Sequence, residues 1–453
     1  MSVPLLLRRL WDDRGVLVSW SAAMALLLAV SVVLGVLVVD QRGLALLGAV
    51  ALLIVAIAAV DLATICVLAV PGSLIMLRVG GFLSAADVIL AGATVVAIIL
   101  YSAREARPMQ PLIWLGVVYL ASLVPTLILN PYHQNLVEWL HEGVLVLGSL
   151  VVGWVAGRSG GGPRALNLYL ICCVAIAIAA IVTGALLFVS QGSFGPVYLP
   201  YLHKNLIGNA LAVAFVIAYA RPPWCPWRTG WTWTVIVLSV LGIFASQSRQ
   251  AMIAAVIGAV IVNLRPRIDT GRRSRLIWLA AIPAVVFVIS AVHNQLQSGN
   301  EFNSTNQRIT WFRQSIEIWQ QQPLFGVGLR WWYTGRFNAQ FQPPNAEFEM
   351  LTSGGIVGLA GFLVLFLGAT WVLAQLHPRY GTVALAVVVT RFTQGQFDLY
   401  WVAGQASLLW LVAGIAYGVQ ARERALGTAP PTPRREPARL RLRPGLSAAK
   451  DRL

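Results

Sequence analysis

Two basic residues stand where apolar segments begin or end, positions at which a charge is costly in a membrane and therefore informative, and a third lies in the long polar stretch. Lys204 opens one apolar segment, and Arg249 lies in the short turn Ser246–Gln250 between two others. Arg308 lies in the first turn of an expected polar helix. A guanidinium fork matches phosphate oxygens bidentately, and the free amides of a helix N-terminus also favour anions. These residues predict a site for a phosphorylated ligand.

Lys204 is one of only two lysines in a chain with 31 arginines, and it lies between His203 and Asn205. Keeping a lysine here suggests a need for a compact ammonium group. The alternative is an interfacial lysine whose charge reaches towards water. An interfacial anchor is likewise the alternative for Arg249.

The stretch Asn306–Gln322 is expected to form an amphipathic helix, with Ser304 or Thr305 available to cap it. Trp311 follows Arg308 by one turn and shares the proposed anion site. The alternative is a helix lying flat on lipid headgroups.

Two acids, Glu347 and Glu349, are the best-placed carboxylates for accepting a proton. They are two residues apart and do not share a helix face, so they are not a paired-carboxylate glycosidase site. A further polar rim is expected near the end of a later apolar segment: Arg391, Gln394, Gln396 and Asp398.

The sequence predicts neither a metal site nor a cofactor. The five histidines are scattered, and the four cysteines lie in apolar segments or in the turn at Cys225. Metal centres need His, Cys or carboxylate ligands at matched spacings, and no such set is visible.

The composition predicts a polytopic membrane protein of the all-α class. The chain is 58% hydrophobic with a mean hydropathy of +0.74, whereas soluble domains are about 45–50% apolar. About 12–14 transmembrane helices and one large extracytoplasmic loop are expected, because a span needs about 20 apolar residues. The apolar segments are Val16–Val38, Gly43–Val60, Leu62–Leu77, Ala85–Tyr101, Pro111–Leu129, Leu136–Ala156, Ala165–Val189, Leu206–Ala220, Thr229–Ala245, Gln250–Leu264, Leu276–Val292, Gly354–Gln375, Gly381–Thr390 and Tyr400–Val419.

Charge distribution predicts the orientation. With the N-terminus in the cytoplasm, 24 of the 33 basic residues fall on the cytoplasmic side, as the positive-inside rule requires. This places both termini inside and the polar loop 294–350 outside. The expected parts are N-terminal spans (1–293), the loop, C-terminal spans (351–420) and a disordered tail (421–453). Loops facing anionic lipid account for the net charge of +16, so nucleic acid is not an expected partner.

Several short motifs resemble the O-antigen ligase and O-antigen polymerase superfamily of bacterial membrane glycosyltransferases. No single motif is specific, but their order and spacing match between about Leu62 and Trp401. They are Pro71–Asp87, His203-Lys204-Asn205 with Gly208, Ser248-Arg249, Arg308-Ile309-Thr310-Trp311, Pro323–Gly328, Asn345 with Gly355 and Gly358-Leu359, and Gly395–Trp401.

The resemblance implies a GT-C-like fold in which a glycan passes from a polyprenyl diphosphate to an acceptor hydroxyl at the outer face of the bacterial cytoplasmic membrane. The partners would be this donor, a glycan, glycolipid or protein acceptor, and membrane lipid, with neither metal nor nucleotide. The implied catalytic residues are Arg249, Arg308, Asn345 and Glu347. The implied substrate-binding residues are His203, Lys204, Asn205, Trp311 and Arg391.

One position departs from the family pattern. Many ligases have His-Asn at the start of the segment after the loop, and here Pro344 precedes Asn345. Proline carries no proton, so Glu347, Glu349 or His203 would serve as the base, or no strong base is required. Two other classes remain open: a transporter or flippase of lipid-linked glycans, and a non-catalytic scaffold of a polysaccharide assembly complex.

Overall fold

The structure, a computed structural model, describes residues 61–80, 83–193, 195–266, 304–337 and 341–430. The predicted spans Val16–Val38, Gly43–Val60 and Leu276–Val292 and most of the predicted tail lie outside these residues. The predicted all-α membrane architecture is confirmed. The number of spans in the whole chain stays a prediction.

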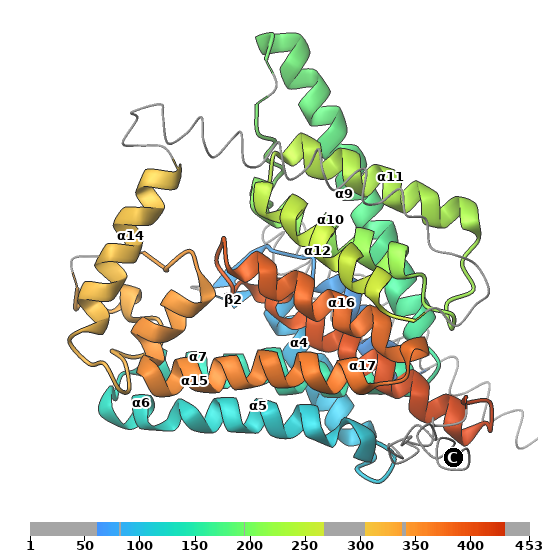
Figure 1. Cartoon of the computed structure of the whole chain (residues 1–453), viewed down its shortest axis with the longest axis horizontal. Coiled ribbons are helices and arrows are strands. Elements are labelled where there is room, and N and C mark those ends of the chain that lie inside the picture. The colour runs from blue at the N-terminus through green and yellow to red at the C-terminus, as the bar shows by residue number, and fades with distance from the viewer. Residues whose placement is uncertain (1–60, 81–82, 194, 267–303, 338–340, 431–453) are drawn as a thin grey trace, which may run out of the picture.

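Helices dominate the described residues (Figure 1). The α-helices are α3 (Ala63–Gly72), α4 (Ala85–Leu100), α5 (Gln110–Ser122), α6 (Val124–Leu129), α7 (His133–Gly143), α8 (Ser149–Arg158), α9 (Gly162–Gln191), α10 (Lys204–Ala220), α11 (Thr229–Ser246), α12 (Arg249–Leu264), α14 (Ser304–Trp319), α15 (Ala346–Gln375), α16 (Pro378–Gly395) and α17 (Ala403–Ala425). Short helical turns are η1 (Arg107–Met109), η2 (Val144–Gly148, of π type) and η3 (Trp331–Tyr333). Strands β1 (Arg78–Gly80) and β2 (Leu83–Ser84) pair antiparallel.

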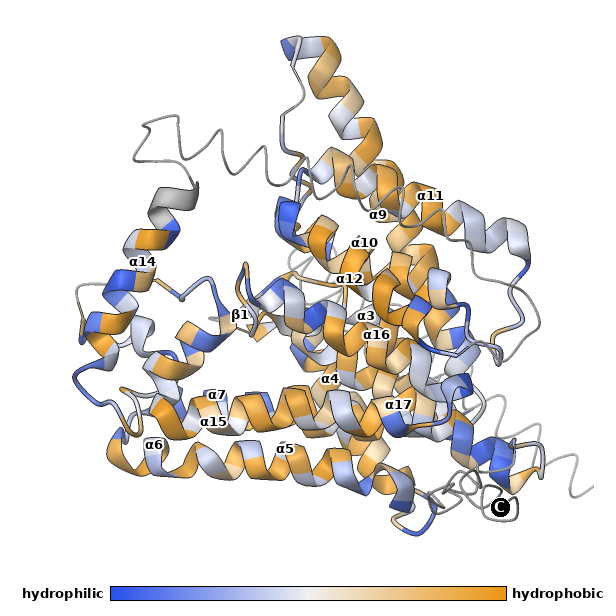
Figure 2. Cartoon of the chain, in the orientation of Figure 1, coloured by the Kyte–Doolittle hydropathy of each residue, from blue (hydrophilic) through white to orange (hydrophobic). Residues whose placement is uncertain are grey.

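Five helical stretches in the described residues are long and apolar enough to cross a membrane. They are Arg107–Leu129, His133–Arg158, Gly162–Gln191, Thr229–Ser246 and Ala346–Gln375. Four shorter apolar helices, α3, α4, α10 and α12, complete this group. In Figure 2 the long helices are predominantly hydrophobic, whereas α14 alternates hydrophobic and hydrophilic residues as the sequence predicts.

Close helix contacts hold the bundle together. α8 and α17 pack through Gly153 and Gly157 on one helix and Gly414 and Gly418 on the other. A Cβ at Gly153 would lie 2.1 Å from the Leu411 carbonyl oxygen, so the two backbones touch. Small residues spaced by four allow this approach in membrane bundles, where van der Waals packing drives association.

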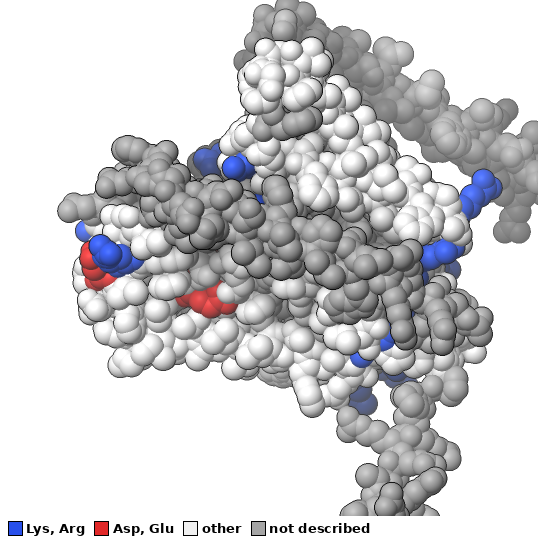
Figure 3. Space-filling model, turned by 45° about the horizontal axis from the view of Figure 1, so that its top comes forward, with Lys and Arg blue, Asp and Glu red and all other residues white. Residues whose placement is uncertain are grey.

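The two ends of the bundle differ in character. At one end lie α14 and the starts of α7, α10, α12 and α15, here called the loop end (Figure 1). At the opposite end Arg158 pairs with Glu105 at 2.6 Å, and Arg379 pairs with Glu423 at 2.9 Å. Figure 3 shows basic side chains at both ends of the visible face and acidic ones toward the left, and the described surface between is mostly uncharged.

Helix α15 is broken at Gly355, whose φ of 66° and ψ of −164° lie outside the helical region. Only glycine adopts this conformation readily. The segment Pro323–Gly328 fills the break through four backbone hydrogen bonds, such as that from the Val327 amide to the Thr352 carbonyl oxygen at 2.9 Å and that from the Ile356 amide to the Pro323 carbonyl oxygen at 3.0 Å. Non-helical backbone within a membrane protein is tolerated when other protein groups satisfy it in this way.

Candidate functional site

Three charged side chains from three other segments lie within electrostatic range of Lys204 at the loop end. The charges of Arg249, Arg308 and Asp398 all act on Lys204. Arg308 in turn acts on Arg249, and Asp398 acts on Arg308. We call Lys204, Arg249, Arg308 and Asp398 the cationic cluster. Three positive charges against one carboxylate leave an excess of two, which favours an anionic ligand.

Helices α10 and α12 hold two members of the cationic cluster together by packing tightly. Lys204 and Arg249 are the first residues of these helices. One turn into α10, Gly208 faces α12, and a Cβ placed there would lie 2.4 Å from the Ser248 Cβ and 2.9 Å from the Ala251 Cβ. Glycine is therefore required for this spacing. Its hydrogen side chain lets the two helix N-termini, with their positive dipole ends, approach each other.

The carboxylate of Asp398 is fixed by a polar chain reaching into the bundle. Gln250 donates to the Asp398 Oδ2 at 2.6 Å and to the Asn209 Oδ1 at 3.4 Å. Asn209 donates to the Gln405 Oε1 at 3.2 Å, and Gln405 donates to the Leu206 carbonyl oxygen at 3.0 Å. Buried amides hydrogen-bonded in series have defined positions, so the single acid of the cluster is set by α10, α12 and α17 together.

His203 caps α10 and contributes to the cluster as a neutral group. Its Nδ1 accepts a hydrogen bond from the Asn205 amide at 3.3 Å. Burial lowers the pKa of His203 below its usual value, the charge of Lys204 lowers it further, and Asp398 opposes both. The net effect favours the uncharged imidazole. Asn205 is the second residue of α10 and is partly exposed beside it.

Arg308 remains charged although it is partly buried. Burial lowers the pKa of Arg308, and the Asp398 carboxylate raises it. Because an arginine starts from a pKa above 12, such shifts leave it protonated at neutral pH. Trp311, one turn on, stacks on Phe341 with ring centroids 5.6 Å apart, so it packs within the loop.

Asn345 and Glu347 are hydrogen-bonded to Gln396, which lies two residues before Asp398. Asn345 caps α15 by accepting a hydrogen bond from the Phe348 amide at 2.9 Å, and its amide donates to the Gln396 carbonyl oxygen at 2.9 Å. Gln396 donates to the Glu347 Oε1 at 2.5 Å. The other oxygen, Oε2, is buried and has no hydrogen-bond partner among the described residues.

Arg391, predicted to bind substrate, has structural partners. It is buried and donates to the carbonyl oxygens of Leu399, at 3.3 Å, and Tyr400, at 2.5 Å. Its guanidinium also lies 4.9 Å from the centroid of the Tyr400 ring. These contacts fix the turn that precedes α17 and carries Asp398, so the hydrogen bonds of Arg391 serve to hold that turn.

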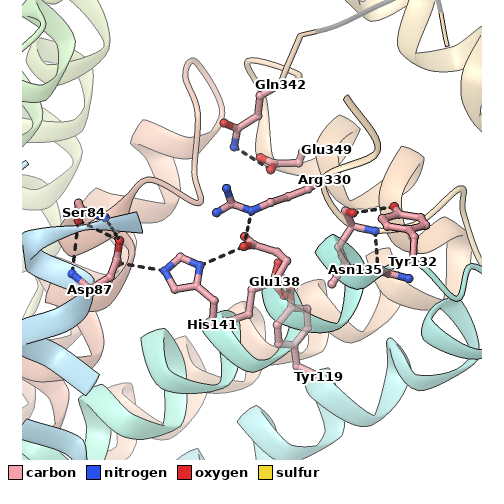
Figure 4. Close-up of polar contacts among 12 residues, drawn as sticks. Ser84, Asp87, Tyr119, Tyr132, Asn135, Glu138, His141, Arg330, Gln342 and Glu349 are labelled. Atoms are coloured by element: carbon pink, nitrogen blue, oxygen red, sulfur yellow. Dashed lines mark hydrogen bonds and ion pairs between the residues drawn. The ribbon is translucent and has the colours of Figure 1, made fainter. Parts of the chain in front are cut away.

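A second group of buried charges was not singled out by the sequence analysis (Figure 4). Asp87 on α4 contacts the His141 Nε2 at 3.0 Å, and Glu138 contacts the His141 Nδ1 at 3.1 Å. Glu138 also forms an ion pair with Arg330 of the loop. We call these four residues the buried ion chain. It joins α4, α7 and the loop inside the bundle.

Two further acids lie close to the buried ion chain. Tyr119 donates to the Glu142 Oε2 at 2.6 Å, and Gln342 donates to the Glu349 Oε1 at 2.8 Å. Figure 4 shows Arg330 extending between Glu138 and Glu349. Glu349 therefore faces the buried ion chain, whereas Glu347 faces Gln396. The two acids point to different partners, as their spacing of two residues predicts.

The buried ion chain belongs to a larger set of contacts that anchors the loop to α6 and α7. Asn135 accepts from the Leu329 amide at 2.9 Å, Asn130 donates to the Gly326 carbonyl oxygen at 3.1 Å, and Tyr132 donates to the Leu329 carbonyl oxygen at 2.7 Å. Arg336 donates to the Asn130 Oδ1 at 3.1 Å. Arg336 thus helps to hold the loop, although it lies outside the matched sequence motifs.

The sequence carried a signal for the buried ion chain. Glu138, His141 and Glu142 are ionisable residues within the predicted span Leu136–Ala156, and such residues are functional candidates wherever they occur in a span. Asp87 follows Ser84 by three residues, and the two form a reciprocal capping box at the start of α4.

Within the described ranges, no group of three or more His, Cys, Asp or Glu side chains is arranged to hold a metal ion. The loop end thus presents the basic side chains of the cationic cluster and, on α15, the Glu347 carboxylate with one oxygen that has no hydrogen-bond partner among the described residues.

Fold and site together define a helical membrane protein with a cluster of basic side chains at one end of its bundle. Residues 234–363 match the model of a family described as O-antigen ligase. The match confirms the resemblance to the O-antigen ligase and polymerase superfamily, and it includes Arg249, Arg308, Asn345 and Glu347. A search of curated proteins finds no match. The family indicates a membrane glycosyltransferase of the O-antigen ligase type.

Proposed function

We propose that this protein transfers a glycan from a polyprenyl diphosphate to an acceptor hydroxyl, at the outer face of the bacterial cytoplasmic membrane. The observation that carries the proposal is the convergence of Lys204, Arg249 and Arg308 from three separate segments. Their excess of two positive charges over Asp398 complements the two ionised groups of a diphosphate diester. Fork-shaped donors at two of the three positions suit its oxygens.

The reaction needs charge stabilisation more than any other assistance. The acceptor oxygen attacks the anomeric carbon of the donor sugar, and the bond from that carbon to the diphosphate oxygen breaks. The polyprenyl diphosphate departs with the bonding electron pair, so negative charge grows on it in the transition state. Arg249, Arg308 and Lys204 stabilise that charge because they are already oriented before the bond breaks.

Glu347 takes the proton of the acceptor hydroxyl. It is on the first turn of α15, it is joined through Gln396 to the turn that carries Asp398, and its Oε2 has no partner within the described part of the chain. Gln396 holds the other oxygen at 2.5 Å and so orients the carboxylate. Asn345 supports the arrangement through the Gln396 carbonyl oxygen. In this chain Glu347 replaces the proton acceptor that Pro344 does not provide.

The test is glycan transfer by purified protein carrying Arg249→Ala or Arg308→Ala, with a lipid-diphosphate glycan as donor. Loss of one charge-stabilising donor typically costs about 10²–10³ in rate, and we expect each alanine variant to fall by this factor. Lysine at either position should recover only part of the rate, because it lacks the bidentate fork.

Arg313→Ala is the matched control, since Arg313 is exposed on the same helix as Arg308. Arg336 is unsuitable as a control because it anchors the loop. Normal transfer by both Arg249→Ala and Arg308→Ala, at wild-type protein levels, would refute the catalytic assignment and favour a transport or scaffold role.

A further inference from the structure

An open cavity of about 490 Å³ lies at the end of the bundle opposite the cationic cluster. It is formed where α9 and α11 begin, together with the turn that precedes α11. Its lining includes Arg164 and Asn167 from α9, Trp227 and Arg228 from the turn, and Trp231 from α11. Its volume is within the range of about 300–1,000 Å³ that is typical of ligand pockets. None of these residues belongs to the site described above.

The polar part of the cavity suits an anion at a membrane surface. Arg164 and Arg228 are both exposed, and both line the same cavity. The turn between α10 and α11 is held in shape by Arg221, which donates to the Trp227 carbonyl oxygen and to the Thr229 hydroxyl, each at 3.2 Å. The wall of the cavity that this turn forms is therefore fixed by hydrogen bonds. Tryptophan is typical of the level of lipid headgroups in membrane proteins, and two tryptophans line this cavity.

Two apolar stripes run from the cavity along the outside of the bundle. On α9 the exposed residues Ile171, Ile178, Val182 and Leu186 follow a helical spacing, and Ile171 itself lines the cavity. On α11 the corresponding exposed residues are Trp233, Val237, Leu241 and Phe244. Ile171 and Leu186 are fifteen positions apart in α9, which corresponds to about 22 Å along the helix and exceeds the half-thickness of a bilayer core, about 15 Å.

We infer that this cavity binds the headgroup of an anionic phospholipid, whose acyl chains lie along the exposed stripes of α9 and α11. The two arginines bind the phosphate, and the tryptophans and Asn167 surround the rest of the headgroup. Basic pockets between helices at a membrane surface are a known mode of anionic lipid binding. A soluble anion would use the arginines alone and would leave the adjoining stripes without a role. This inference does not depend on the proposed transfer reaction.

The test measures lipid retention by the purified full-length protein in neutral detergent, by native mass spectrometry, with phosphatidylglycerol and phosphatidylcholine of equal chain length. We expect tighter binding of phosphatidylglycerol. Substituting both arginines, Arg164→Gln with Arg228→Gln, should lower its affinity roughly 25-fold, at a factor of five for each basic residue near an anionic lipid. Phosphatidylcholine has the same phosphate but no net charge, so its affinity should fall by a smaller factor. An unchanged melting temperature shows that the variant is folded.

Two other pairs of substitutions serve as controls. The pair Arg104→Gln with Arg107→Gln removes the same charge outside the lining of this cavity and should leave phosphatidylglycerol binding as it is. The pair Arg164→Lys with Arg228→Lys keeps the charge and should retain most of the affinity. Equal loss from both glutamine pairs, equal binding of the two lipids, or displacement of phosphatidylglycerol by inorganic phosphate would each overturn the inference. No glycan donor is present, so these outcomes do not bear on transfer.

Discussion

Replacing Gly208 with alanine should separate the two helix N-termini that carry Lys204 and Arg249. The added Cβ would lie 2.4 Å from the Ser248 Cβ and 2.9 Å from the Ala251 Cβ. Carbon atoms in contact stay about 3.5–4.0 Å apart, so α10 and α12 must move apart by about 1 Å. Overpacking of this kind costs about 1–3 kcal/mol of stability, and a misplacement of 1 Å at an active site lowers the rate by about 10²-fold.

The assay is glycan transfer by purified Gly208→Ala protein, compared with its melting temperature. We expect transfer to fall by about 100-fold, because both charges remain but are displaced from each other. The protein should remain folded, because overpacking costs only about 1–3 kcal/mol. Gly92→Ala is the matched control, since a Cβ at Gly92 in α4 meets nothing within 4 Å among the described residues. Combining Gly208→Ala with Ser248→Gly should recover part of the rate, because only the Ala251 contact then remains. A Gly208→Ala variant with the wild-type rate would show that the spacing of α10 and α12 does not matter.

Three further predictions concern the loop, the orientation and the reaction. Glu138→Gln should lower stability by about 3–5 kcal/mol, because it breaks the buried ion pair with Arg330. Thermal unfolding measures this loss. A second substitution, Arg330→Met, should recover part of it, whereas additive losses would argue against the ion pair. The orientation is tested with single cysteines, Ser298→Cys or Ser447→Cys, at positions outside the described residues. On intact cells an impermeant thiol reagent should label Ser298→Cys and should not label Ser447→Cys. The reverse pattern would overturn the proposed orientation. Transfer by the purified protein should continue in a chelator, and a loss restored by a metal ion would contradict the metal-independent reaction.

Several features of this protein follow from its sequence because they depend on local composition. The span predicted at Ala165–Val189 is α9, and the helix predicted at Asn306–Gln322 is α14, which is described from Ser304 to Trp319. Lys204 and Arg249 each begin a helix. A charge at the border of an apolar run must lie near a membrane surface, so charges at borders on the same side can meet.

Other features depend on pairings between distant residues. Glu138 and Arg330 are 192 residues apart, and no periodicity links them. The span prediction for Leu136–Ala156 rests on the average hydropathy of a window, which assigns no role to single acids within it. The contact between Arg336 and Asn130 could not be predicted for the same reason, because the two residues are 206 positions apart. Charges inside a predicted span should therefore be examined together with the basic residues of distant loops.

The broken helix α15 limits how substrates can enter. Pro323–Gly328 is hydrogen-bonded into the break at Gly355 as if it were part of that helix. A loop that swings open as a whole would have to break these backbone bonds inside the bundle. Helix α14 is held to the same assembly, because Phe312 stacks on Phe348 of α15 with ring centroids 4.6 Å apart, and Ile318 is buried against Val327 and Trp331. Arg308 is therefore carried on a helix that is tied to α15, and its position is set before any substrate binds. Substrate would reach the cationic cluster beside this assembly, without a swing of the whole loop.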